Sequence, residues 1–232
     1  GKLLQLDPSG RFIIGLDRDE AAEIVIVSRS AEGFESHSFD IKKRTYNIQR
    51  ITGIEQKYVD PDPVQVTRSK REAALVWRAR QAQRSQNDFM RGFIWPASGP
   101  ITGVFGSQRV YNGKPRRPHY GVDIAGPVGT AVVAPASGKV ALAEDDLYFS
   151  GGTIIIDHGH GLSSSFLHLS EISVSVDQPV SKGEVIGAIG ATGRVTGPHL
   201  DWRLNWTGSG ENQRLDPQLL MPEPEPLLAE NP

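Results

Sequence analysis

Cysteine is absent from the 232-residue sequence. This absence excludes disulfide bridges, thiolate metal ligands and thiol catalysis, although it does not identify the cellular compartment. No run of eighteen apolar residues occurs either, so we expect no transmembrane segment. A formal net charge of -2 gives no electrostatic reason to expect a nucleic-acid partner. The chain begins at Gly1 without a charged-then-apolar leader, and we interpret Gly1 as either an added residue or a trimmed start, so that a signal or anchor could have been removed.

The composition that remains is that of an ordinary globular protein, with 38% hydrophobic and 22% charged residues. Residues 1–62 alternate short β-rich runs with turn residues. The runs are RFIIGL (11–16), AAEIVIVSR (21–29), ESHSFDI (35–41) and TYNIQRI (45–51). Their Ile, Val, Phe and Tyr content is typical of strands. We therefore predict a small antiparallel, sandwich-like β-domain over residues 1–62.

A basic, helix-favouring stretch follows this β-rich segment. Pro61 and Pro63 disfavour helix at the residues before them, so they end the first domain. The sequence from Thr67 to Met90 predicts a helix with Thr67 as its N-cap, inside a linker spanning residues 63–94. We expect this helix to bridge two domains with one face in solvent; contact with an anionic envelope polymer is the alternative.

Residues 95–222 are rich in glycine and in short strands, which predicts an all-β domain with a curved or partly closed sheet. The last residues, 223–232, are rich in Pro and Glu and have little to bury, so we expect a frayed tail. The whole chain is therefore predicted to be mainly β, with two β-domains and one connecting helix.

Three histidine clusters lie in the second domain. The first pairs His119 with Asp123, the second is His168, and the third pairs His199 with Asp201. Imidazole and carboxylate groups are zinc ligands, and catalytic zinc usually has three protein ligands and one open position. Each cluster alone is a weak signal. The glycines near His119 and His199 strengthen it, because glycine-rich turns let the backbone approach a ligand.

These clusters lie in sequence blocks that resemble the lysostaphin/LytM-type zinc endopeptidases, which cleave peptide bridges in peptidoglycan. The blocks are GPITGVFGSQRV, RPHYGVDIAGPVGTAVVAPASGKV, GGTIIIDHGHGLSSSFLHLSEISV, VSKGEVIGAIGATGRVTGPHLDWRLN and LDPQLL. They follow one another in the family's order and cover nearly all of Trp95 to Leu220. The resemblance implies an antiparallel half-barrel of the duplicated hybrid motif type, bound Zn2+ and a peptidoglycan peptide substrate.

The resemblance also implies a role for each clustered residue. His119 and Asp123 match the family's H-x-x-x-D zinc ligands, and His168 matches its catalytic histidine. His199 matches the first histidine of the family's H-x-H motif, which is catalytic. The second histidine of that motif is the third zinc ligand, and this chain has Asp201 in its place.

Aspartate at position 201 changes what we expect of the site. A carboxylate oxygen binds zinc at nearly the distance of an imidazole nitrogen, about 2.0–2.2 Å. A His/Asp/Asp set carries one more negative charge than His/Asp/His, which predicts a weaker Lewis acid and less selectivity against manganese or magnesium. The alternative is that Asp201 marks a catalytically inactive LytM-like module that binds peptidoglycan or regulates an amidase.

Other residues have a weaker claim to a functional role, or none. His158 and His160 also have H-x-H spacing, but their flanking glycines indicate a solvated hairpin. Arg109 and Tyr120 are candidates for holding the substrate. The segment VSKGEVIGAIG is similar to the hairpin of lipoyl carrier domains, but Lys182 precedes the strand and does not lie at a hairpin tip.

The sequence therefore predicts a zinc-dependent peptidoglycan endopeptidase of the periplasm or cell envelope, and we expect a monomer. Resemblance to Gram-negative relatives indicates D-alanyl–diaminopimelate bridges as the substrate bond. The N-terminal domain has three possible roles: a spacer, a wall-binding module, or an inhibitory cap over the groove.

Overall fold

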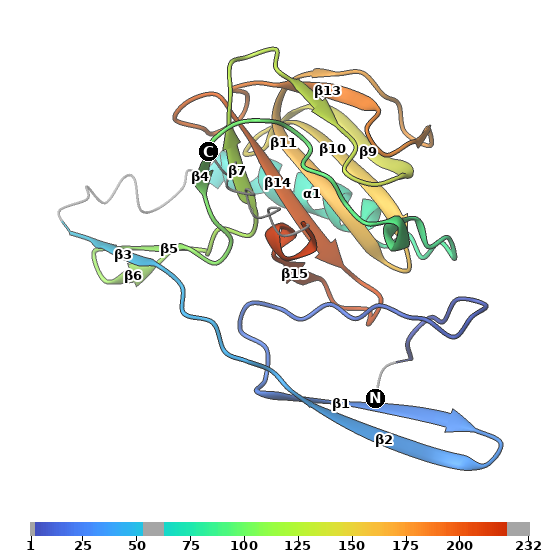
Figure 1. The fold of residues 1–232 in the computed structure, drawn as a ribbon. Coiled ribbons are helices and arrows are strands. Elements are labelled where there is room, and N and C mark those ends of the chain that lie inside the picture. Colours follow the sequence, from blue (N-terminus) through green and yellow to red (C-terminus); the bar gives the residue numbers. More distant parts are fainter. Residues whose placement is uncertain (1–2, 53–62, 222–232) are drawn as a thin grey trace, which may run out of the picture.

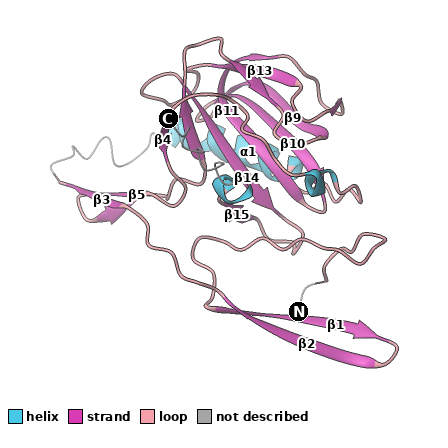
Figure 2. Ribbon diagram, viewed as in Figure 1, coloured by secondary structure: helices cyan, strands magenta, loops and turns pink. Residues whose placement is uncertain are grey.

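The computed structural model describes residues 3–52 and 63–221 (Figure 1). Strands dominate it, and α1 (Pro63–Ala79) is the single α-helix within those ranges (Figure 2). The prediction of a mainly β protein with one helix and a large antiparallel sheet is confirmed. Among the described helices, none has the length and apolar character needed to cross a membrane. The domain limits at residues 62 and 94 stay predictions, and the tail at 223–232 lies outside the described residues.

The large sheet contains ten strands, all paired antiparallel. Its main path runs through β12 (Pro179–Val180), β9 (Gly138–Leu147), β10 (Gly151–Gly159), β11 (Leu162–Ile172), β14 (His199–Trp206), β7 (Val122–Ala125) and β4 (Ile101–Gly103). Two branches complete it: β13 (Val185–Ile189) joins β8 (Ala131–Val133) to β11, and β15 (Gln213–Leu215) extends the sheet beyond β14. The sheet gives the functional residues a rigid platform.

The central strands present two different faces, because successive side chains of a strand point to opposite sides. On one face Phe166, Leu200 and Trp202 are fully buried and belong to the main hydrophobic core. The other face carries Asp201, which lies opposite Leu167 of β11 and Asp123 of β7. We call this second surface the Asp201 face.

Helix α1 packs on the Asp201 face, where Val76 and Ala79 contact a cluster that includes Ile155 of β10. The predicted helix from Thr67 to Met90 is wrong at both ends, since α1 begins at Pro63 and ends at Ala79. Tertiary hydrogen bonds account for the early end. The Thr207 hydroxyl donates to the carbonyl oxygen of Arg80, and the Arg80 side chain donates to Ser165. The chain then continues irregularly to a short 3-10 turn, η2 (Asp88–Arg91).

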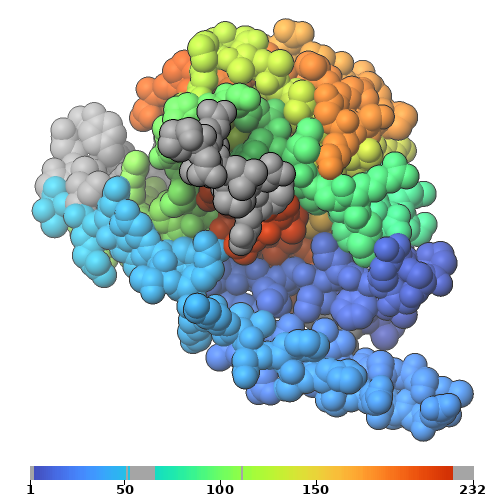
Figure 3. All heavy atoms as spheres, in the orientation of Figure 1, coloured from blue at the N-terminus to red at the C-terminus, as the bar shows by residue number. Residues whose placement is uncertain are grey.

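The N-terminal segment contains one hairpin, formed by β1 (Glu23–Ser30) and β2 (Gly33–Asp40). It extends away from the body of the molecule in Figure 3, and most of its side chains are exposed. The next strand, β3 (Ile48–Ile51), pairs in parallel with β5 (Gln108–Tyr111), which in turn pairs with β6 (Lys114–Pro115). The N-terminal segment therefore shares a sheet with strands that follow α1 in the chain.

The predicted strand at residues 11–16 does not form. Instead, Ile13 and Ile14 pack against the main core, and Gly15 lies against Trp206 of β14. A Cβ atom at Gly15 would lie 2.7 Å from Cβ of Trp206, so the close approach requires glycine. The apolar residues that indicated a strand are explained by burial against another element.

Candidate metal centre

The pairing of β7 with β14 brings two of the predicted metal ligands together. Asp123 lies directly opposite Asp201 in the register, and both side chains are on the Asp201 face. His119 precedes β7 and lies four residues before Asp123 in the sequence. One ligand atom from each of these three residues lies within 4.8 Å of the others. The strand pairing therefore brings Asp201 to His119 and Asp123, from which it is far apart in sequence.

The surroundings of this group fit a divalent cation. Nε2 of His119 and Oδ1 of Asp123 are 3.2 Å apart, and both are buried without a hydrogen-bond partner among the described residues. Buried polar atoms are normally satisfied, so this pair points to a missing partner between them. A Cβ atom at Gly103 would collide with the Asp123 carboxylate, and one at Gly121 would collide with that of Asp201. One nitrogen and two carboxylate oxygens suit zinc and also harder metal ions.

A β-bulge accounts for the position of His168. Gly152 and Ile154 of β10 pair with Leu169 and Phe166 of β11, so the β11 side of this stretch contains one extra residue. His168 has a φ of 68°, in the left-handed region that non-glycine residues seldom adopt. The bulge interrupts the alternation along β11 and re-aims this side chain. Without it, His168 would point to the same side as the core residue Phe166.

His168 and His199 lie next to each other, with ring centroids 4.9 Å apart. Nδ1 of His168 is 2.9 Å from the carbonyl oxygen of Thr192, and Nδ1 of His199 is 2.9 Å from that of Gly197. A carbonyl oxygen only accepts, so each Nδ1 carries the proton and donates it. Nε2 is therefore the free nitrogen of both neutral rings. Nε2 of His199 is 3.8 Å from Oδ1 of Asp123, which places this ring beside the metal-ligating group.

Arg203 is a member of the site that was not identified from the sequence. It follows Asp201 by two residues on β14, so both side chains are on the same face. Nε of Arg203 lies 3.0 Å from both oxygens of Asp201, and Nη2 donates to Oδ2 as well. The Asp201 side chain is 3% exposed and that of Arg203 is 28% exposed. The spacing of two residues between Asp201 and Arg203 is the sequence signal that could have identified Arg203.

The charges of the site shift the pKa values of its members. Burial alone would raise the pKa of Asp201, but the Arg203 guanidinium outweighs it and lowers the pKa. Burial acts to lower the pKa of His119, while the nearby carboxylates of Asp123 and Asp201 raise it to a net value above normal. Burial lowers the pKa of His168, which favours its neutral form near pH 7.

The ion pair between Arg203 and Asp201 changes the net charge that the sequence predicts for the site. Asp201 adds one negative charge relative to a histidine, but Arg203 places one positive charge directly on that carboxylate. The two carboxylates and Arg203 together carry the same net charge as a His/Asp/His set. Each carboxylate oxygen has more than one lone pair, so contact with Arg203 leaves Asp201 able to bind a cation. The predicted loss of Lewis acidity is therefore largely offset.

The two residues predicted to hold substrate lie in different places. Arg109 is exposed on β5 and pairs through its backbone with β3, and no ion pair connects it to the metal-ligating group among the described residues. Tyr120 is adjacent to His119, and its ring lies between 5.6 and 5.7 Å from the guanidinium carbons of Arg117 and Arg214. The geometry favours Tyr120 over Arg109 as a neighbour of the site.

The prediction of a solvated hairpin at His158 and His160 is wrong. Both side chains are almost completely buried. His158 donates from Nδ1 to the carbonyl oxygen of Ser137 and accepts at Nε2 from the Ser164 hydroxyl, and both contacts are 2.8 Å. Phe93 packs edge-on against its ring. These histidines are structural, and burial lowers the pKa of His158 to about 4.

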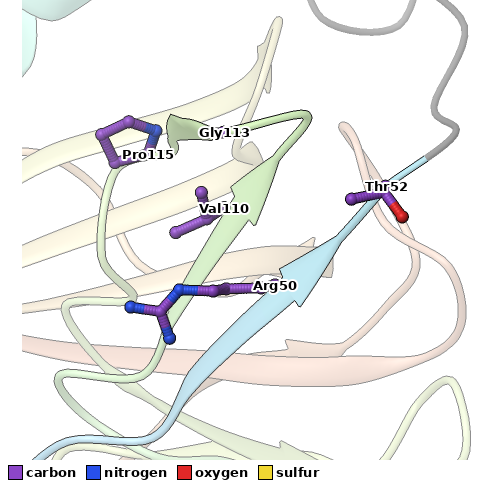
Figure 4. Close-up of a pocket in the computed structure, with 5 residues that line it drawn as sticks. All are labelled: Arg50, Thr52, Val110, Gly113 and Pro115. Carbon is purple, nitrogen blue, oxygen red and sulfur yellow. The ribbon is translucent and has the colours of Figure 1, made fainter.

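A separate surface hollow lies on the small sheet of β3, β5 and β6. It is lined by Arg50, Thr52, Val110, Gly113 and Pro115, as Figure 4 shows. None of these residues belongs to the metal-ligating group or to its histidine neighbours. The hollow is therefore distinct from the candidate metal centre.

Comparison with known proteins agrees with this geometry. Residues 117–217 match peptidase family M23. A solved structure of a putative M23 peptidase from Pseudomonas aeruginosa has a TM-score of 0.70 and 30% identity, and the alignment covers 95% of this chain and 84% of that one. The peptidoglycan DD-endopeptidase ShyA of Vibrio cholerae is 45% identical over 38% of this chain and 20% of its own length.

A second Vibrio cholerae relative, the peptidoglycan DD-endopeptidase ShyB, is 30% identical over 82% of this chain and 47% of its own length. The chain thus spans less than half the length of these two curated relatives. The Pseudomonas structure, in contrast, is matched over most of both chains. Together with the family match across His119, Asp123 and Asp201, this shows that the chain belongs to peptidase family M23.

Proposed function

We propose that the protein is a zinc-dependent endopeptidase that hydrolyses peptide cross-links of bacterial peptidoglycan. The observation that carries this proposal is the convergence of His119, Asp123 and Asp201 beside the ring pair of His168 and His199. Three potential metal ligands next to two groups that can transfer protons are sufficient for metal-assisted hydrolysis. The names of the relatives ShyA and ShyB support peptidoglycan as the substrate.

In this proposal His119, Asp123 and Asp201 hold the metal ion. A bound Zn2+ would supply Lewis acidity, which polarises a scissile carbonyl and makes water a better nucleophile. Gly103 and Gly121 leave the space in which the two carboxylates are oriented. Arg203 keeps Asp201 ionised and fixes the orientation of its carboxylate through the contacts from Nε and Nη2.

His168 and His199 handle protons and developing charge. Each ring is fixed through Nδ1 on a backbone carbonyl, so its Nε2 is free to accept a proton. The low pKa of the buried His168 keeps that nitrogen unprotonated at neutral pH. The neighbouring ring can donate a hydrogen bond once it is protonated, which stabilises negative charge on the substrate. Which of the two rings acts as the base depends on the position of the substrate.

The proposal extends to the cellular location of the protein and to the peptide bond that it hydrolyses. A peptidoglycan substrate would put the protein in the periplasm or cell envelope, and the names of the relatives ShyA and ShyB, both peptidoglycan DD-endopeptidases, support a peptide cross-link as the bond that is hydrolysed. A non-catalytic module that binds peptidoglycan or regulates an amidase is the alternative, and metal content distinguishes the two.

The test combines metal analysis with digestion of purified sacculi. We expect close to one zinc ion per chain and release of un-cross-linked muropeptides, and we expect His119→Ala to abolish both. His37→Ala is the matched control, because His37 is exposed on β2, outside the metal centre. Metal-loaded protein that leaves cross-links intact would refute the proposal. Metal-free protein that still binds sacculi would favour the non-catalytic alternative.

A further inference from the structure

The Asp201 face becomes strongly basic along β14, away from the metal-ligating group. Arg203 follows Asp201 on this strand and lies opposite Ser165 of β11. Asn205 comes next on the same face and lies opposite Arg214 of β15. Arg203 and Arg214 therefore lie on the same surface, one beside Asp201 and the other on the adjoining edge strand.

A third arginine reaches this surface from another part of the chain. Arg80 follows the last residue of α1, and its Nη2 donates to Ser165 Oγ at 2.9 Å. Its side chain is almost completely buried, and Nε has no hydrogen-bond partner among the described residues. Since Ser165 lies opposite Arg203, Arg80 reaches the Asp201 face at the register position of Arg203.

Apart from Arg203, these cations have no side-chain ion pair among the described residues, although the Asp17 carboxylate accepts from the Arg214 backbone N–H and favours the charged form of Arg214. Arg203 pairs with Asp201, but within the described parts of the chain Arg80, Arg117 and Arg214 form no ion pair with a carboxylate. Burial and the charges of Arg214, Arg203 and Arg117 lower the pKa of Arg80 well below its usual range. Burial and the charges of Arg203 and Arg117 lower the pKa of Arg214 to about 10, against the opposing effects of Tyr120 and Asp17. A buried arginine without an acidic partner is costly in free energy, and proteins normally pair such charges.

The protein does not use these arginines for its own ion pairs, so the position suits an external anion. Guanidinium groups bind carboxylates through two parallel hydrogen bonds, and this geometry makes arginine the preferred residue for that purpose. Ser163 Oγ and Asn205 Oδ1 are also buried without partners on the same face. This part of the sheet therefore holds unused polar groups around an excess of positive charge.

We infer that Arg214, with the buried Arg80 adding positive charge behind it, forms a carboxylate-binding subsite that recognises an acidic group of the substrate peptide next to the scissile bond. The inference rests on the proposed function, because the subsite shares a strand face with Asp201. Two residues of a strand span about 7 Å, so the subsite begins about that far from the metal-ligating carboxylate. A carboxylate one to three residues from the scissile bond would reach it. Arg117, exposed beside Tyr120, adds positive charge at the rim.

The experiment compares cross-linked muropeptide dimers in two forms, native and with their carboxylates chemically converted to amides. We expect the wild-type protein to cleave the native form with a kcat/KM about tenfold higher, mainly through KM, because the charge-assisted hydrogen bonds are lost with the amide. Arg214→Gln should remove most of this preference, because its kcat/KM on the native form falls to nearly that on the amidated form. Arg214→Lys should restore part of it, and Arg29→Gln on the exposed hairpin is the matched control.

A second measurement separates this inference from the proposed function. Binding of both dimers to His119→Ala is measured by calorimetry, which does not require cleavage. A preference for the native form in binding supports the subsite even if no cleavage occurs, whereas cleavage of both forms at equal rates and equal binding overturns it. Arg80→Gln should raise the thermal stability of the ligand-free protein and lower its affinity for the native dimer. A purely structural Arg80 would instead lose stability and leave the carboxylate preference intact.

Discussion

Replacing Asp201 with asparagine should destabilise the metal-free protein as well as its metal binding. The variant keeps the size of the side chain but removes the charge that compensates Arg203. Breaking a buried ion pair from one side costs about 3–5 kcal/mol. Arg203 is 28% exposed and can recover some hydration, so we expect the low end of that range. About 3 kcal/mol corresponds to a lower melting temperature by roughly 6–12 °C in a protein of this size.

The assay is urea unfolding in EDTA, where bound metal makes no contribution. Asp201→Asn, Arg203→Gln and the double variant form a cycle, and we expect a coupling energy of about 2 kcal/mol. In metal titrations Arg203→Gln should bind divalent cations more weakly than the wild type, because Asp201 loses the guanidinium that keeps it ionised and oriented. A coupling energy below about 0.5 kcal/mol would refute the charge-balance argument for this site. Metal binding by Arg203→Gln as tight as that of the wild type would contradict the orienting role of Arg203 independently.

Three further predictions concern other parts of the molecule. The pKa of His158 is about 6.5 in the unfolded chain, and burial lowers it to about 4 in the folded protein. The unfolded state therefore binds this proton first as the pH falls, so the free energy of unfolding should decrease by about 2–3 kcal/mol between pH 7 and pH 4.5. His158→Asn should remove that part of the slope in urea unfolding, and equal slopes would contradict the assignment. Gly121→Ala should weaken metal binding at least about tenfold by displacing Asp201, as measured by competition with a chelator. Deleting residues 1–22 should cost about 2 kcal/mol or more in unfolding experiments, whereas excising the hairpin at residues 23–40 should cost less than about 1 kcal/mol.

The site was easier to predict from the sequence than the path of the N-terminal half. His119, Asp123 and Asp201 could be identified because resemblance connected residues that periodicity alone could not connect. Arg203 could have been found by the same spacing of two that relates His199 to Asp201. The position of His168 depends on a bulge, and no residue type near it in the sequence signals one.

The errors elsewhere have a common physical cause. Residues 11–16 and the end of the predicted helix were assigned from local pattern, yet tertiary contacts determine both. Ile13 and Ile14 are apolar because they cover the core, and α1 ends where Arg80 makes hydrogen bonds with other strands. His158 was interpreted as solvated from its flanking glycines. Its actual burial depends on Phe93, which arrives from a segment sixty-five residues earlier.

The order of charges along β14 also indicates how a substrate would lie. The two carboxylates that suit a metal are at the His199 end of the strand, and the unpaired guanidiniums of Arg80 and Arg214 lie toward its other end. A peptide that places its scissile carbonyl at the first position and an acidic group at the second would therefore follow the strand direction. The same peptide in the reverse orientation would carry its acidic group away from Arg214 and lose the charge-assisted hydrogen bonds to the guanidinium. Electrostatics on one sheet face would thus select both the substrate and its orientation, and exchanging Arg214 for glutamate should disfavour native dimers more strongly than Arg214→Gln does.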